Sequence, residues 1–147
     1  MIGEYDEKAE KAKNTLTYLE KPEQEIRNED NNMKKMEITI RPESLEKLKD
    51  ILAKNGVHGM TVYSAMGAGN QNSDISKIVE LSGGQFHVNL LPKIVVITYI
   101  EDERSEKLIS EIVDELSTGN VGDGKIALVP LETIVRIRTG ESGSKAL

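Results

Sequence analysis

The 147-residue sequence contains no cysteine and no tryptophan, and aromatic residues make up only 3% of it. The absence of cysteine excludes disulfides, thiolate zinc sites and cysteine nucleophiles. The scarcity of aromatic side chains and a net charge of −6 both argue against a nucleic-acid partner. No apolar run is long enough to span a bilayer, and the first residues are charged rather than signal-like. We therefore expect a cytoplasmic protein.

Motifs of catalysis and of metal binding are also lacking. Two histidines without a fixed spacing do not form a metal-ligand set, so no resident metal site is predicted. No Ser-His-Asp order and no H-E-x-x-H motif stands out, and the many carboxylates do not identify an acid–base pair. We predict no catalytic residues and a protein that is not an enzyme.

Residues 1–32 are predicted to form an extension that precedes a domain at residues 33–147. Apolar residues recur in the extension at spacings of three and four, which is typical of an amphipathic helix of about five turns. These residues are Ile2, Tyr5, Ala9, Ala12, Leu16 and Leu19. The polar stretch 20–32, which contains Pro22, is typical of a linker. The helix either packs on the domain or on a partner, or it frays.

The first half of the domain alternates strand and helix patterns. Apolar residues at every second position predict a strand at residues 36–40, with one buried face. An amphipathic helix follows and ends at Asn55-Gly56. A second strand runs from about residue 60 to a glycine turn at 67–69. The polar stretch 70–89 has no convincing period and is predicted to be a functional loop.

The second half repeats this order. A third strand is centred on residues 94–97, and a helix follows it. The inner face of that helix is predicted to carry Leu108, Ile109, Ile112, Val113 and Leu116. A strand at 126–129 and an extended segment at 134–138 complete the chain. The order βαββαβ predicts an α+β, ferredoxin-like fold with helices on one face of an antiparallel sheet, so the bare face needs a cover, most simply another copy.

Two features suggest an anion pocket. In Gly122-Asp123-Gly124-Lys125, the glycines allow backbone amides to approach an anion and the lysine supplies a charge. The alternative interpretation is a tight turn before a strand. Arg136 and Arg138, two residues apart on an extended segment, are predicted to share one face, where two guanidiniums favour an anion between them. Solvated edge arginines are the alternative there. With the glycines at 67–69, these residues predict a polyphosphate pocket.

The sequence also resembles the PII signal-transduction family across residues 33–147. The resemblance rests on Met33-Lys34-Lys35, Arg41-Pro42-Glu43, Gly59-Met60-Thr61-Val62, Leu91-Pro92-Lys93, Thr118-Gly119, 121–126 and 136–141. It implies a homotrimer with ATP or ADP in the clefts between ferredoxin-like subunits. It further implies a sensor of the ATP/ADP ratio, often with Mg²⁺ and 2-oxoglutarate. Such a regulator controls a transporter, such as an ammonium channel, or a soluble enzyme through its long T-loop, here at about 70–89.

Site residues follow from the resemblance by position. Positions that match nucleotide-binding ones are Thr61, Gly67, Gly69, Gly122, Asp123, Gly124, Lys125, Arg136 and Arg138. Gln71 and Lys93 match the residues that hold the magnesium-bound effector.

Three departures from the family pattern keep alternatives open. Ala68 and Asn70 replace the usual aromatic and arginine, and Phe86 stands where many members carry a modified tyrosine. We therefore expect no uridylylation. One alternative is an adenine-nucleotide sensor that ignores 2-oxoglutarate and regulates a partner outside nitrogen control, and a second is a slow ATPase. A metal-handling trimer is the least supported alternative, because cysteines are absent.

Overall fold

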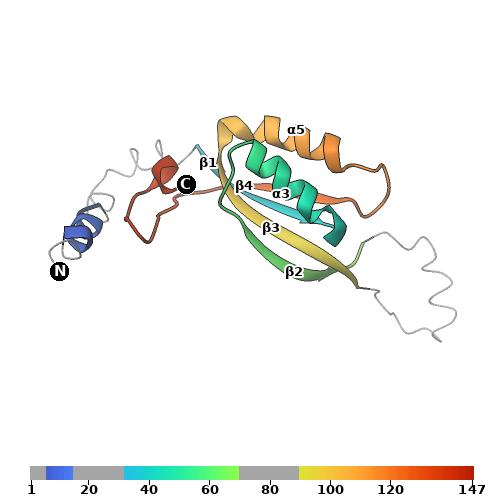
Figure 1. Ribbon diagram of the computed structural model, residues 1–147, viewed down its shortest axis with the longest axis horizontal. Coiled ribbons are helices and arrows are strands. Elements are labelled where there is room, and N and C mark those ends of the chain that lie inside the picture. The colour runs from blue at the N-terminus through green and yellow to red at the C-terminus, as the bar shows by residue number, and fades with distance from the viewer. Residues whose placement is uncertain (1–5, 15–31, 70–89) are drawn as a thin grey trace. The chain divides into compact units, whose positions relative to one another are not determined.

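A computed structural model of the chain describes residues 6–14, 32–69 and 90–147 (Figure 1). Four strands form one antiparallel sheet in the order β2-β3-β1-β4. They are β1 (Met33–Ile40), β2 (Thr61–Gly67), β3 (Leu91–Glu101) and β4 (Gly124–Pro130). The connecting helices are α3 (Leu45–Lys54) and α5 (Ser105–Leu116), accompanied by the short 3₁₀ helices η1 (Pro42–Ser44), η2 (Asp102–Arg104) and η3 (Gly143–Ala146). This order of elements confirms the predicted ferredoxin-like fold.

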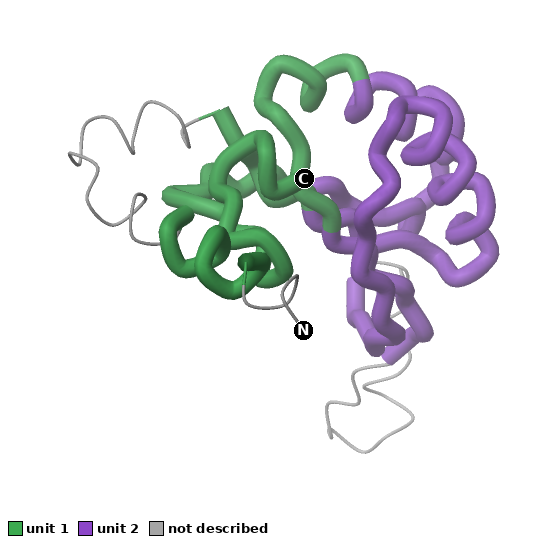
Figure 2. Tube along the Cα trace, turned by 60° about the vertical axis from the view of Figure 1, so that its left-hand side comes forward, with its two compact units in different colours: residues 1–36, 98–107, 128–147 green, residues 37–97, 108–127 purple. Residues whose placement is uncertain are grey.

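The chain divides into two compact units (Figure 2). Unit 1 comprises residues 1–36, 98–107 and 128–147, and unit 2 comprises residues 37–97 and 108–127. Unit 2 therefore contains α3, β2 and the loop that leads into β4. The arginines Arg136 and Arg138 belong to unit 1.

The core of unit 2 is built from apolar residues at the predicted spacings. Ile38 and Ile40 are buried on β1 and lie two residues apart, as one face of a strand requires. The buried apolar residues of the two helices are Leu48, Ile51, Leu52, Leu108 and Ile112. Each such side chain contributes about 1.5–3 kcal/mol through burial. Val113 was predicted to face inward but is 50% exposed, because it lies about 140° around the helix from Leu108.

Helices α3 and α5 lie side by side and are joined by polar contacts (Figure 1). The Lys47 ammonium lies 3.0 Å from the Glu115 carboxylate, and Lys54 lies 3.1 Å from Glu111. Glu111 also accepts a hydrogen bond from the side-chain amide of Asn55, the residue that caps the C-terminal end of α3. Gly56 follows with a φ of 70°, which confirms the predicted helix end. The ion pairs are largely exposed, so they contribute little stability.

The extended segment predicted at 134–138 is wrong. Within unit 1 only an isolated bridge joins Val135 to Ser142, and a turn follows at 137–139. The amide of Gly140 donates to the carbonyl of Arg136 at 2.8 Å, and the φ of Gly140 is 72°. The glycine therefore bends the chain back on itself, and Arg136 and Arg138 do not share the face of a regular strand.

Part of the predicted N-terminal helix is present, at residues 6–14. The rest of the predicted stripe lies outside the described residues, as do Asn70, Gln71 and Phe86 and the rest of the loop 70–89. In the part of the chain that the structure describes, no helix is both long and apolar enough to cross a bilayer.

Candidate functional site

The loop that enters β4 has a backbone that requires glycine. Gly122 and Gly124 have φ values of 99° and 128°. A Cβ atom on Gly124 would lie 2.0 Å from the carbonyl oxygen of Thr39 on β1. A side chain at residue 124 would thus force β1 and the loop apart. Glycine at residue 124 thus has a structural reason in the packing against β1, and the predicted approach of the loop amides to an anion stays a prediction.

Asp123 closes the loop on the end of α5. Its Oδ1 accepts a hydrogen bond of 2.6 Å from the Thr118 hydroxyl, and its Oδ2 accepts one of 2.8 Å from the Thr118 amide. These hydrogen bonds, foremost that of the Thr118 hydroxyl, hold the pKa of the Asp123 carboxyl below its usual value, and the charge of Arg41 acts in the same direction. The carboxylate is therefore stabilised in its charged form.

Arg41 joins the end of β1 to the same loop. Its Nε donates to the carbonyl of Gly122 at 3.1 Å, and its Nη2 donates to the carbonyl of Val121 at 2.7 Å. The guanidinium also lies 3.9 Å from Oδ1 of Asp123. Arg41 belongs to a motif on which the family resemblance rests, but it is not among the predicted site residues. Its position directly before Pro42, where β1 ends, was the available signal.

Lys93 reaches the loop from β3. Its ammonium donates to the carbonyl of Gly122 at 3.2 Å, so this carbonyl accepts from two cations. Gly67 on β2 makes room for the lysine, because a Cβ atom there would lie 3.1 Å from Cγ of Lys93. The structure thus brings together Gly67, Lys93 and the loop 122–124.

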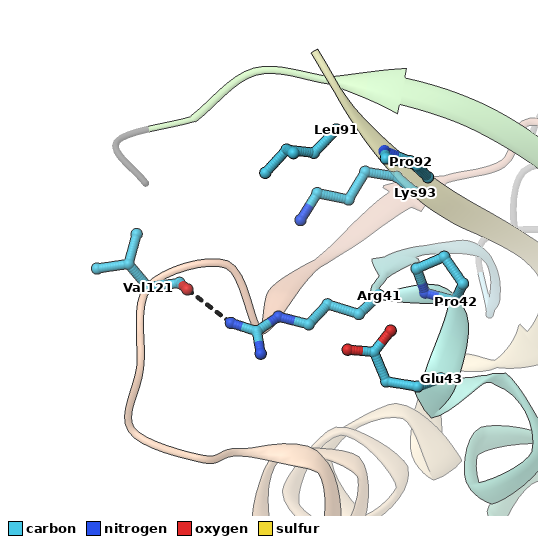
Figure 3. Close-up of a pocket in the computed structure, with 7 residues that line it drawn as sticks. All are labelled: Arg41, Pro42, Glu43, Leu91, Pro92, Lys93 and Val121. Carbon is cyan, nitrogen blue, oxygen red and sulfur yellow. Dashed lines mark hydrogen bonds between the residues drawn. The ribbon is translucent and has the colours of Figure 1, made fainter. Parts of the chain in front are cut away.

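These cations line a pocket of about 440 Å³ (Figure 3). Its walls are formed by Arg41, Pro42, Glu43, Leu91, Pro92, Lys93 and Val121. The Lys93 ammonium and the Arg41 guanidinium both extend toward Val121 (Figure 3). Two positive groups against one negative wall residue, Glu43, make a pocket suited to an anion.

The remaining predicted residues of unit 2 are more dispersed. Thr61 begins β2 and Gly67 ends it, so a strand length of about 20 Å separates them. Gly69 has open space where a side chain would lie. Lys125 is exposed on β4. Gln71 lies outside the described residues.

In unit 1, the side chain of Arg136 is held by the C-terminal segment. Its Nη1 donates to Oε2 of Glu141 at 3.0 Å, and its Nη2 donates to the carbonyl of Leu147. Arg138 is exposed. Within the described ranges no group of three or more His, Asp or Glu is arranged to hold a metal ion.

Comparison with known proteins gives a consistent picture. The family described as nitrogen regulatory protein P-II matches residues 33–141. The chain is 40% identical over 115 residues to nitrogen regulatory protein P-II 2 of Methanothermobacter thermautotrophicus. The aligned segment covers 78% of this chain and 97% of that protein. It is 39% identical to the P-II protein of Azospirillum brasilense, over 78% of this chain and all of that one.

Solved structures agree. The structure of B. subtilis GlnK in complex with ATP superposes with a TM-score of 0.65 at 30% identity, over 80% of this chain and 98% of that one. The structure of Arabidopsis thaliana PII bound to citrate gives a TM-score of 0.62 at 27% identity, over 80% of this chain and 94% of that one. On this evidence the chain belongs to the nitrogen regulatory protein P-II family of signal-transduction regulators.

Proposed function

We propose that the protein is a signal-transduction regulator that binds ATP and ADP and responds to their ratio. The observation that carries this proposal is the loop 122–124, whose two glycines adopt positive φ and which is followed by the exposed cation Lys125. Backbone amides in such a loop are suited to phosphate oxygens, and a lysine adds a point charge. The relative from B. subtilis was solved with ATP, which supports the same ligand here.

Further contacts to the nucleotide come from the other predicted residues. Gly67 and Gly69 offer backbone without side chains at the end of β2. Thr61, at the far end of that strand, would contact the nucleotide of a neighbouring subunit in the proposed homotrimer. Arg136 and Arg138 are proposed as nucleotide-binding residues on the family resemblance alone. Because Arg136 is paired with Glu141 here, nucleotide binding exchanges one anionic partner for another.

The pocket of Arg41 and Lys93 is proposed to take a small dicarboxylate such as 2-oxoglutarate. Its two cations lie close to one carbonyl, and an anion between them would relieve their mutual repulsion. The Arabidopsis relative was solved with citrate, a carboxylate ligand. Gln71 and the nucleotide phosphates would hold the Mg²⁺ expected with such an effector.

The regulated partner is proposed to be a membrane transporter or a soluble enzyme that binds the loop at 70–89. The domain at 33–147 carries the ligand sites, and the extension 1–32 lies outside the family match. On β2, Tyr63 is 45% exposed, which suits a sheet face covered by another copy.

A second function, an adenine-nucleotide sensor that ignores 2-oxoglutarate, is favoured by one specific observation. Lys93 and Arg41 both already donate to the carbonyl of Gly122, so these cations have an acceptor without any effector. The departure at Asn70 points the same way. In that case the partner lies outside nitrogen control.

Calorimetric titration with Mg-ATP and Mg-ADP, each with and without 2-oxoglutarate, tests both functions. Binding that is lost in Lys125→Ala supports the nucleotide site, and absence of binding to the wild type refutes it. ATP affinity that increases with 2-oxoglutarate, and no longer does so in Lys93→Met, supports the effector pocket. Affinity that is unchanged by 2-oxoglutarate supports the second function.

A further inference from the structure

We propose that Thr118 is a positioning residue for the phosphate loop, and that the Asp123 carboxylate closes this loop instead of contacting the ligand. The proposal rests on the proposed nucleotide function and assigns separate roles to two residues of the same site. Thr118 belongs to a motif on which the family resemblance rests but was given no role in binding.

The Asp123 carboxylate is hydrogen-bonded to Thr118 through both of its oxygens. Each of its two oxygens accepts a short hydrogen bond from Thr118, at 2.6 Å from the hydroxyl and 2.8 Å from the amide. Hydrogen bonds to a charged acceptor are about twice as strong as neutral ones. They join the two ends of the segment 118–123 and close it into a small ring through the Asp123 side chain.

The ring is anchored on both sides by packed elements of the fold. Thr118 lies two residues after the last residue of α5, Leu116, so the ring begins close to the end of a packed helix. On the other side of the ring, Gly124 lies against the backbone of β1. We infer that these two anchors hold the backbone of residues 122–124 in one conformation before any ligand binds. A loop that is ordered in advance binds more tightly, because the ligand does not have to meet the entropic cost of ordering it.

The negative charge of Asp123 matters because the proposed ligand is also negatively charged. A carboxylate that faced a polyphosphate would repel it unless a cation lay between them. Here the Thr118 donors and the nearby Arg41 guanidinium occupy the carboxylate. The residue thus contributes its backbone to the phosphate site while its charge is used inside the loop.

Four variants of the full chain test this role: Thr118→Val, Thr118→Ser, Asp123→Asn and, as a control, Ser117→Ala. Ser117 is an exposed neighbour whose hydroxyl is replaced without touching the ring. We expect Thr118→Val to lower the affinity for Mg-ATP by about tenfold or more, since it removes a hydrogen bond to a charged group. Thr118→Ser keeps the hydroxyl and should stay within about threefold of the wild type, as should Ser117→Ala.

Amide hydrogen exchange without nucleotide gives a second measurement that does not depend on ligand. Exchange at residues 119–124 should accelerate in Thr118→Val and Asp123→Asn but not in the other two variants. The proposal is overturned if amide exchange in Thr118→Val is the same as in the wild type. It is also overturned if Thr118→Val binds Mg-ATP with the affinity of the wild type. If the wild type binds neither ATP nor ADP, the proposed function fails, while exchange still decides whether Thr118 closes the loop.

Asp123→Asn separates loop closure from direct metal contact. An asparagine accepts from Thr118 through one atom only, so one of the two hydrogen bonds is lost. If Asp123 closes the loop, the loss of affinity is equal for Mg-ADP and for ADP in the presence of a chelator. A loss confined to the magnesium complex would instead identify Asp123 as a metal contact and overturn the proposal. A cooperative thermal unfolding transition confirms that each variant is folded.

Discussion

Replacing Gly124 by alanine tests the close packing of the loop on β1. The new Cβ would lie 2.0 Å from the Thr39 carbonyl oxygen, 3.0 Å from its carbon and 3.2 Å from Cα of Ile40. All three atoms belong to the backbone of β1, so no side chain can move aside to make room.

The magnitude has two parts. Alanine at a φ of 128° is strained by about 1–3 kcal/mol. Moving the backbone of β1 and the loop apart costs about 1–3 kcal/mol more, as overpacking does in cores. We therefore expect Gly124→Ala to lower the free energy of unfolding by about 2–6 kcal/mol.

Urea unfolding followed by circular dichroism measures this loss. Gly59→Ala is the matched control, because nothing lies within 4 Å of its added Cβ. It should change the free energy of unfolding by less than about 0.5 kcal/mol. A loss below about 1 kcal/mol in Gly124→Ala would refute the argument, since the loop would then accept a side chain without separating from β1.

Three further predictions concern the polar contacts of the loop. Arg41→Leu removes the donors to the carbonyls of Val121 and Gly122 together with a nearby positive charge, so it should raise the pKa of Asp123 toward its ordinary value. NMR titration of the carboxyl carbon measures this pKa, and an unchanged value would contradict the prediction. Because the folded-state pKa of Asp123 is lowered, its contribution to stability is full above the unfolded value of about 3.9 and is lost as the pH falls through the folded value. The free energies of unfolding of the wild type and of Asp123→Asn, measured between pH 2 and 5, should therefore converge at the acid end of this range. A difference between the two proteins that stays constant over the range would exclude the effect. Gly67→Val should weaken binding of a dicarboxylate by displacing the Lys93 side chain, while Gly59→Val should not, and titration calorimetry compares the two.

Much of the fold follows from local patterns. The alternation of Ile38 and Ile40, the helix stop at Asn55-Gly56 and the glycines before β4 each appear in the structure where the sequence predicts them. These features depend on neighbours within a few residues, so spacing and residue type suffice to locate them. The extended segment at 134–138 was wrong because Gly140 adopts a positive φ, which a run of alternating residues does not reveal.

The site shows the same limit more clearly. The sequence indicates that Gly122 and Lys125 belong to a phosphate loop, but the role of Arg41 depends on a contact across 81 positions of sequence. No local pattern encodes which carbonyl such a long side chain will reach. The Thr118–Asp123 contact spans only five residues, yet the direction of the carboxylate depends on how the glycines turn the chain.

The carbonyl of Gly122 has a consequence for communication between ligands. It is a shared acceptor for Arg41 and Lys93, so one peptide group connects the anion pocket with the loop that we propose binds phosphate. An anion that draws Lys93 away from this peptide changes the affinity of the loop for its own ligand. Thermodynamic linkage then requires the loop's ligand to change the affinity of the pocket by the same factor. Coupling between the two sites can thus arise within one subunit, through a single oxygen atom.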